Sequence, residues 1–177
     1  MQHPLFVLVD MQTRLVPAMS DNENCMKRQE ILLQACPHVG VPVFVTEQYP
    51  QGLGNTVENL ASLLPEDVKI FAKKSFSCFE DEAFASAVAA SGARTIVLAG
   101  CETHVCVMQT ALDAVEKGYE CVVIADGVAS RKEGDKALAL ETLRSRGVWV
   151  IGSESWLFEC LKSAKHPGFK AVSALIK

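Results

Sequence analysis

The stretch Leu5-Phe6-Val7-Leu8-Val9-Asp10 decides the fold, because it is a continuous apolar run closed by an acidic residue. A strand without polar alternation is buried on both faces, which is typical of parallel sheets covered by helices on both sides. Five further short runs rich in β-branched and aromatic residues follow at 41–46, 69–72, 95–100, 121–125 and 148–151. The pattern therefore predicts six mainly parallel strands.

Amphipathic stretches separate these runs. We expect helices at about 22–36, 55–63, 80–91, 103–117, 133–146 and 154–163, with an irregular loop at 47–55. Strands that alternate with helices predict an α/β fold: a Rossmann-like, three-layer α/β/α sandwich around a six-stranded, mainly parallel sheet. No linker or repeat interrupts the pattern, so residues 1–177 are expected to form a single domain.

The amino-acid composition indicates which classes of partner the protein is expected to bind. The 17 Lys and Arg and 21 Asp and Glu give a net charge of −4 without a basic run, so we expect no nucleic-acid partner. No apolar run approaches the roughly 18 residues of a membrane span, so we expect no membrane partner. The first residues lack a signal-peptide pattern, and the seven cysteines contain no C-x-x-C pair. These features predict reduced thiols in the cytoplasm, with a mitochondrial location left open.

Open α/β sheets bind ligands in the crevice beyond the carboxyl ends of their strands. An acid, an amine and a thiol are expected to meet there. The candidates at the strand ends are Asp10, Gln48, Tyr49, Lys73 or Lys74, Cys101 to Cys106, and Asp126. Lys73 and Lys74 are adjacent and face opposite sides, so only one can face the crevice. Asp10 has an alternative role as a cap of the next turn.

Cys106 is the candidate nucleophile. If Thr103 caps the following helix, Cys106 lies in its first turn, where the helix dipole lowers a thiol pKa and free N–H groups can hold an oxyanion. The alternative is a buried structural cysteine. His104 is two residues away and points to another side of the helix, so we expect it to be a capping, supporting or interface residue.

Five segments resemble the isochorismatase-like cysteine hydrolase family, and especially its small isochorismatase-domain proteins. They are Leu8-Val9-Asp10-Met11-Gln12, Lys73-Lys74-Ser75-Phe76-Ser77-Cys78-Phe79, Gly100-Cys101-Glu102-Thr103-His104-Val105-Cys106-Val107, Asp126-Gly127-Val128-Ala129-Ser130-Arg131 and Ser153-Glu154-Ser155-Trp156-Leu157-Phe158-Glu159. The resemblance implies a catalytic triad of Asp10, Lys73 and Cys106 and a cis peptide bond between Cys101 and Glu102. It also implies oxyanion donors among residues 102–106, near Val105 and Cys106.

We expect substrate contacts from residues at the same edge: Gln12, Gln48, Tyr49, Phe76, Glu102 and Val105. Nicotinamidases of the family carry Asp and His metal ligands after the second strand, whereas this chain has Glu47-Gln48-Tyr49-Pro50. We therefore expect neither a metal nor another cofactor. Isochorismatases proper need no thiol, so the presence of Cys106 favours acyl chemistry.

The leading hypothesis is a cysteine hydrolase that cleaves an amide-like C–N bond of a small molecule through a thioester. The alternatives are a vinyl ether hydrolase that does not use the thiol, a non-catalytic assembly or binding protein, and, least favoured by the acidic charge, a nuclease. The resemblance also implies a homo-oligomer. The late cluster of Trp149, Trp156, Leu157 and Phe158 either forms its interface or closes the core of the domain.

Overall fold

The computed structural model describes residues 1–177, and a six-stranded sheet of order β3-β2-β1-β4-β5-β6 runs through it. Every neighbouring pair of strands is parallel, which confirms the predicted α/β sheet. The strands are β1 (Pro4–Val9), β2 (Val43–Gln48), β3 (Lys69–Lys73), β4 (Thr95–Cys101), β5 (Glu120–Ala129) and β6 (Trp149–Ile151).

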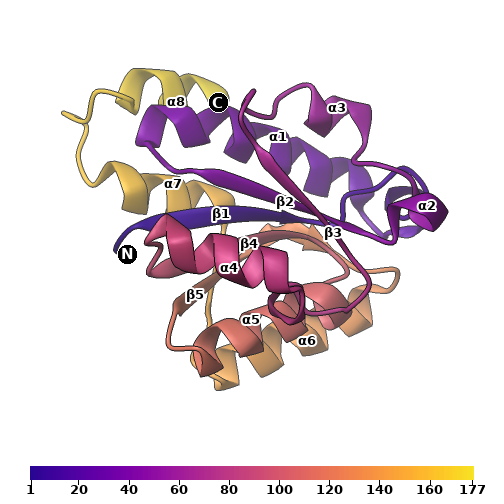
Figure 1. Ribbon diagram of the computed structural model, residues 1–177. Helices are drawn as coiled ribbons and strands as arrows, with labels where there is room; N and C mark the ends of the chain where they lie inside the picture. Colours follow the sequence, from indigo (N-terminus) through magenta and orange to yellow (C-terminus); the bar gives the residue numbers. More distant parts are fainter.

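Helices cover both faces of the sheet (Figure 1). One layer contains α1 (Asn22–Val39), α3 (Glu58–Ala61), α7 (Ser153–Leu161) and α8 (Phe169–Leu175), and the other contains α4 (Glu82–Ser91), α5 (Met108–Glu116) and α6 (Glu133–Ser145). A further short helix, α2 (Pro50–Leu53), lies in the segment predicted to be irregular, and α8 was also not predicted. None of these helices combines the length and the apolar character needed to cross a bilayer.

The apolar run of β1 contributes to both layers of core. Phe6 and Leu8 pack into the core beneath α1, whereas Leu5, Val7 and Val9 pack into the opposite core. Successive side chains of a strand point to opposite faces, so a central strand between two helical layers must be apolar at every position. The run therefore places Asp10 at the carboxyl edge of the central strand.

The late aromatic cluster divides between core and surface. Trp156 and Leu157 are fully buried, and the Trp156 ring lies 5.9 Å from that of Phe6. Trp149 and Phe158 remain 56% and 43% exposed. Closing the core therefore accounts for two members of the cluster, and the other two remain available for a subunit interface.

β5 continues to Ala129, beyond its predicted end at residue 125, because its pairing with β4 shifts register between Leu98 and Gly100. Asp126 consequently does not lie at a strand end. Its carboxylate accepts hydrogen bonds from the Ser153 N–H and Oγ, both at 2.7 Å, at the start of α7. The expectation that Asp126 lies in the crevice is wrong, because its side chain caps a helix.

Gly100 allows β4 to approach β1 just below the site. Its φ is 122°, and a Cβ atom at this position would lie 2.0 Å from the Val9 carbonyl oxygen. Any side chain would force the two strands apart. This close approach brings the residue after β1 and the last residue of β4, Asp10 and Cys101, together at the carboxyl edge of the sheet; the Cys101 Sγ lies 3.3 Å from the Asp10 carbonyl oxygen.

Candidate active site

Asp10 lies at the centre of the polar cluster at the carboxyl edge. It is fully buried and adopts a left-handed conformation with φ 53°, which turns the chain out of β1. Its Oδ2 accepts a hydrogen bond from Lys73 Nζ at 2.7 Å, and its Oδ1 accepts one from Thr46 Oγ1 at 2.7 Å. The side chain thus bonds across the strand ends and does not cap the following turn.

Lys73, the last residue of β3, is buried, whereas Lys74 points into solvent, as the alternation of a strand requires. Besides Asp10, its Nζ donates to Gln48 Oε1 at 2.7 Å and to the carbonyl oxygens of Phe76 and Ser75 at 3.1 and 3.2 Å. Burial is the largest single influence and lowers the pKa of Lys73, but the charge of Asp10, smaller contributions from Cys78 and Cys106 and the hydrogen bond to Asp10 together exceed it, so the pKa is raised. Lys73 is therefore a fixed ammonium ion.

Cys106 is almost fully buried on a π-helical turn, Thr103–Val107, that precedes α5. Burial and then the charge of Asp10 raise the pKa of the thiol to about 12, against the lowering effect of Lys73; a hydrogen bond to Asp10 adds to the rise. The expected lowering of this pKa by the helix dipole is therefore wrong, because desolvation dominates. In its resting state the site contains a neutral thiol beside a carboxylate.

The turn that carries Cys106 also differs from the expected capped helix. Thr103 does not act as an N-cap, since the turn begins after Glu102 without a side-chain cap and the buried Thr103 hydroxyl has no partner. The Glu102 carbonyl oxygen accepts hydrogen bonds from the N–H groups of Val105 and Val107 at 3.1 and 3.2 Å. The Val105 N–H is thus already bonded, and it is not free to hold an oxyanion.

The backbone N–H of Glu102 differs from that of Val105, because no protein group accepts a hydrogen bond from it. The peptide bond from Cys101 to Glu102 is cis. The Glu102 carboxylate is mostly buried, and its Oε2 accepts hydrogen bonds from the N–H and Nε of Arg131 at 3.1 and 2.9 Å. Glu102 thus presents a free N–H at the site, while its side chain is held by the segment that follows β5.

Gln12 and Gln48, two of the residues expected to contact substrate, form hydrogen bonds within the protein instead. Gln12 is fully buried; its Nε2 donates to the carbonyl oxygens of Gln48 and Gly54 at 3.0 and 2.6 Å, and its Oε1 accepts from the Gln48 N–H at 2.7 Å. Gln48 is bonded through Oε1 to Lys73 and through Nε2 to the Lys74 carbonyl oxygen. Both amides are bonded to other protein groups: the Gln48 side chain positions Lys73, and Gln12 holds the Gln48 and Gly54 main chain.

Tyr49 and Phe76, by contrast, remain about half exposed on the two loops that flank Lys73. The Tyr49 N–H donates to the Lys73 carbonyl oxygen at 2.8 Å, and the Phe76 carbonyl oxygen accepts from Lys73 Nζ. Their rings take part in none of the hydrogen bonds that hold the site. We refer to these two exposed side chains as the rim residues.

Three residues of the site were missed by the sequence analysis: Thr46, Cys78 and Thr110. The Thr110 hydroxyl donates to the Cys106 carbonyl oxygen at 2.6 Å and accepts from the Cys78 N–H at 3.0 Å. Thr46 closes the apolar run of β2 as Asp10 closes that of β1, and this signal could have identified it. His104, whose role the sequence left open, lies with its Nδ1 3.0 Å from Ser130 Oγ.

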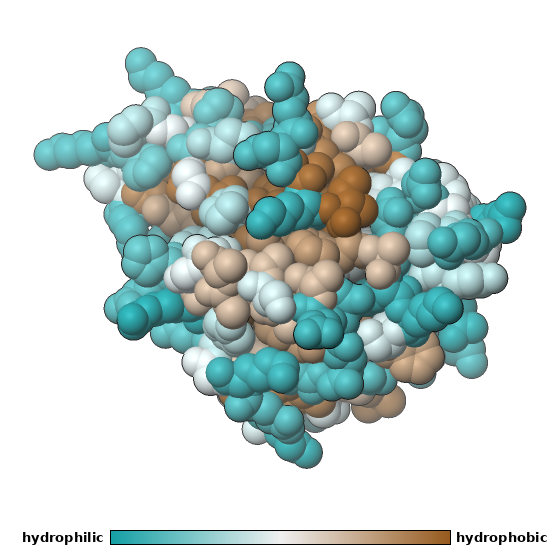
Figure 2. All heavy atoms as spheres, in the orientation of Figure 1, coloured by the Kyte–Doolittle hydropathy of each residue, from teal (hydrophilic) through white to brown (hydrophobic).

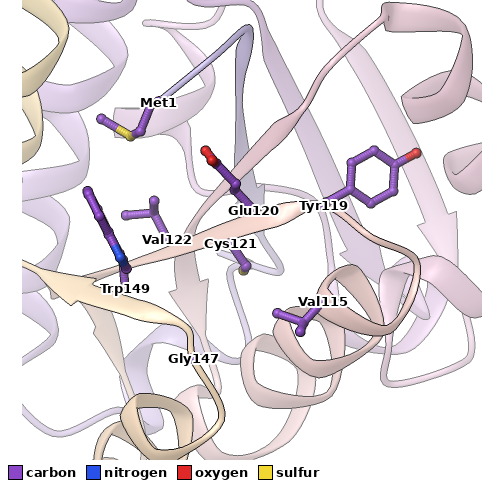
Figure 3. A pocket seen from close by; sticks show the side chains of 8 residues that line it. All are labelled: Met1, Val115, Tyr119, Glu120, Cys121, Val122, Gly147 and Trp149. Carbon is purple, nitrogen blue, oxygen red and sulfur yellow. The ribbon is translucent and has the colours of Figure 1, made fainter.

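The pocket drawn in Figure 3 lies away from this cluster. It has a volume of about 210 Å³, and Met1, Val115, Tyr119, Glu120, Cys121, Val122, Gly147 and Trp149 line it. Glu120 and Trp149 begin β5 and β6, whereas Asp10, Lys73 and Cys106 lie at the carboxyl edge of the sheet. This pocket therefore belongs to the opposite end of the molecule. No group of three or more His, Cys, Asp or Glu residues is arranged to hold a metal ion.

The parallel sheet, covered by helices on both faces, and the polar cluster at its carboxyl edge define a Rossmann-like α/β protein. The chain belongs to the isochorismatase family, since the family model described as "Isochorismatase domain" matches residues 4–155. It is 39% identical to isochorismatase domain-containing protein 1 of Salmo salar over 98% of this chain, and it spans 60% of the length of that relative. It is 36% identical to isochorismatase domain-containing protein 2 of Danio rerio, over 97% of this chain and 86% of the relative.

Solved structures share the fold. MAR1 ribonuclease from Caenorhabditis elegans superposes with a TM-score of 0.93 at 30% identity, covering 98% of this chain and 89% of that one. The YcaC gene product of Escherichia coli, described as an octameric hydrolase of unknown specificity, gives a TM-score of 0.91 at 22% identity, covering 98% and 87%. The second likeness concerns the fold alone.

Proposed function

We propose that this chain is a cysteine hydrolase that cleaves an amide-like C–N bond of a small molecule through a thioester. The observation that carries the proposal is the shared burial of three groups at the carboxyl edge. Asp10 bonds to the Lys73 ammonium at 2.7 Å, and its charge and hydrogen bond act on the Cys106 thiol. A base, a cation and a nucleophile in contact are the parts that acyl transfer requires.

In the first step, Asp10 accepts the proton of the neutral Cys106 thiol as the sulfur attacks the carbonyl carbon. The C–S bond forms and the carbonyl electron pair moves to oxygen. The Glu102 and Cys106 N–H groups are the proposed donors to this oxyanion, because the Val105 N–H is already bonded. Lys73 stays bonded to Asp10 Oδ2 at 2.7 Å and holds the carboxylate in place for the transfer.

In the second step, the proton on Asp10 passes to the departing nitrogen, the C–N bond breaks, and an amine leaves the thioester. Water then attacks the thioester carbonyl, Asp10 accepts a proton from that water, and the acid and the free thiol are released. One carboxylate thus acts in turn as base and acid. The rim residues Tyr49 and Phe76 contact the part of the substrate that does not react.

A panel of small amides and an isochorismate-type vinyl ether tests the proposal. Ammonia and pyruvate release are measured for the wild type, Cys106→Ala and the matched control Cys121→Ala. Cys121 is also buried with a pKa raised to about 12, but it is the second residue of β5, at the opposite edge of the sheet. We expect amide turnover that Cys106→Ala abolishes and Cys121→Ala retains.

Other outcomes select the alternatives. Pyruvate release that survives Cys106→Ala identifies the vinyl ether hydrolase. Absence of turnover on every compound favours a non-catalytic assembly or binding protein. Cleavage of an RNA oligonucleotide, added because a structural neighbour is described as a ribonuclease, contradicts the proposal; the net charge of −4 makes RNA an unfavourable partner.

We further infer that residues 1–177 act as one domain in a homo-oligomer, as the octameric YcaC neighbour does in its own crystal. Trp149 on the edge strand β6 and Phe158 on α7 are large apolar side chains in solvent. Figure 2 shows a second apolar area, a brown and tan band over β3 and α4, and Ile70 of β3 is half exposed. Association would cover such surfaces.

A further inference from the structure

Asp10 has a second hydrogen-bond donor that the proposed mechanism does not use. Thr46 Oγ1 donates to Asp10 Oδ1 at 2.7 Å, and both residues are fully buried. Thr46 pairs in register with Val9, and the Asp10 N–H donates to the Thr46 carbonyl oxygen at 3.0 Å. The pairing of β1 and β2 thus fixes the hydroxyl beside the carboxylate.

The direction of this hydrogen bond follows from a count of hydrogens. A threonine hydroxyl has one hydrogen, and an ionised carboxylate can only accept. The hydrogen therefore points at Asp10, and the Thr46 oxygen is left to accept from another group. Cys78 Sγ lies 3.8 Å away and is a thiol donor to it. Burial raises the pKa of Cys78 to about 11, so this thiol keeps its proton at neutral pH.

We infer that Thr46, with the Cys78 thiol behind it, is a positioning residue that orients the Asp10 carboxylate and favours its ionised form. This inference rests on the proposed function, in which Asp10 must be ionised to accept the thiol proton. The other groups that act on Asp10 are Lys73 from β3, Cys101 from β4 and Cys106 from the π-helical turn. Lys73 donates to Oδ2 and Thr46 donates to Oδ1, so Thr46 is the hydroxyl donor of the carboxylate beside the ammonium and the Cys106 thiol.

Cys78 is also tied to the nucleophile. Its N–H donates to Thr110 Oγ1, whose own hydrogen is donated to the Cys106 carbonyl oxygen. One buried residue thus connects, through two threonine hydroxyls, to the carboxylate and to the turn that carries the thiol. This linkage makes the distance between Asp10 and Cys106 depend on Thr46 and Cys78.

The test compares Thr46→Val, which removes the hydroxyl, with Thr46→Ser, which retains it. Thr95→Val is the matched control: Thr95 is a fully buried threonine at the other end of the sheet, paired with Pro4, and its hydroxyl is 2.9 Å from Glu120 Oε2. Two readouts are used, the pH titration of the Asp10 carboxyl carbon by NMR and the acid limb of kcat/KM. The NMR signal is assigned by its loss in Asp10→Asn.

In Thr46→Val we expect the midpoints of both readouts to rise by about one pH unit, because a carboxylate that loses a donor is more easily protonated. Thr46→Ser should restore them and Thr95→Val should leave them unchanged. Cys78→Ala should shift them in the same direction by less, and it replaces Thr46→Val if that variant does not fold.

Unchanged midpoints in folded Thr46→Val, or in Cys78→Ala where it stands in, overturn the inference even if the wild type hydrolyses amides. A raised NMR midpoint in a protein that turns over nothing supports the positioning role and overturns the proposed function. An equal rise in Thr95→Val also overturns the inference, because it shows a general response to a lost buried hydroxyl.

Discussion

Lys73 and Asp10 form an ion pair of 2.7 Å in which both side chains are completely shielded from solvent. Such a pair contributes little net stability, since the attraction only offsets the cost of removing two charges from water. Removing one partner of the pair lowers the stability of the fold, because the other charge is left buried without a counter-charge. The two partners are not equivalent, since Lys73 Nζ has three further oxygen acceptors, whereas the Asp10 carboxylate accepts from Thr46 Oγ1 and the Cys106 thiol, neither of which carries a positive charge.

Lys73→Met should therefore destabilise the fold by about 3–5 kcal/mol, since it leaves a buried carboxylate without its cation. The adjacent exposed residue provides the control, and Lys74→Met should change the free energy of unfolding by less than about 0.5 kcal/mol. Urea denaturation at neutral pH measures both. Equal stabilities for the two variants would show that the charge on Lys73 is not needed to hold Asp10.

Asp10→Asn should reduce amide hydrolysis by roughly 10²–10⁴-fold, because the thiol loses its base. The fold should persist, since the Lys73 ammonium keeps the carbonyl oxygens of Ser75 and Phe76 and the Gln48 side chain. Steady-state kinetics on a competent substrate, with circular dichroism of the same sample, measure both effects. Turnover at the wild-type rate would remove Asp10 from the mechanism.

Alkylation of Cys106 by iodoacetamide should rise continuously from pH 7 to pH 10 without a plateau, because the thiol pKa is raised to about 12. Asp10→Asn removes a charge and a hydrogen bond that raise this pKa. Alkylation at pH 9–10 should then be faster, by about tenfold for each unit that the pKa falls. Peptide mass spectrometry, with Cys121 as the internal reference, follows the reaction. A plateau near pH 7 would contradict the neutral resting thiol.

The free energy of unfolding should decrease in alkaline solution. All seven cysteines have a pKa raised by burial, so the folded chain holds these protons more tightly than the unfolded chain. Their stabilising effect is complete below the unfolded thiol pKa of about 8.5 and is lost as the pH rises toward the folded values. Denaturation at pH 7.5, 9 and 10 measures the slope. Cys121→Ala should show a shallower slope, and a flat profile would contradict the prediction.

Trp149→Glu should shift the protein toward smaller species in sedimentation at micromolar concentration, if the exposed side of β6 forms the subunit interface. Ile70→Glu, on the opposite edge strand β3, distinguishes the two apolar areas. Dissociation by Ile70→Glu alone would place the interface at β3. A wild-type species of about 19 kDa that stays active on dilution would exclude an oligomer.

The sequence was most informative where burial dictates residue type. The uninterrupted apolar run of β1 predicted a central parallel strand, and the rule that crevices form at strand ends placed Asp10 and Lys73 at one edge. Predictions from the sequence failed where details of backbone conformation determine which groups lie at the site. The register shift beside Leu98 lies in a pairing that extends β5 beyond Asp126, so Asp126 does not lie at the end of the strand. In the π-helical turn, the Val105 N–H donates to the Glu102 carbonyl oxygen. The rise in the Cys106 pKa depends on how deeply the turn is buried, which periodicity does not show.

The loop from Tyr49 to Thr56 is anchored at its base by hydrogen bonds, and the Tyr49 ring lies over Gly52 with half of its surface in solvent. Glu47 Oε1 accepts from the N–H and hydroxyl of Thr56, and Gln12 binds the Gln48 and Gly54 carbonyl oxygens, so main chain and buried side chains set its course. The Tyr49 and Phe76 rings are bound by none of these contacts. Under the proposed function, replacements at these two positions would alter substrate preference over evolutionary time without disturbing the hydrogen bonds that hold Asp10 and Lys73.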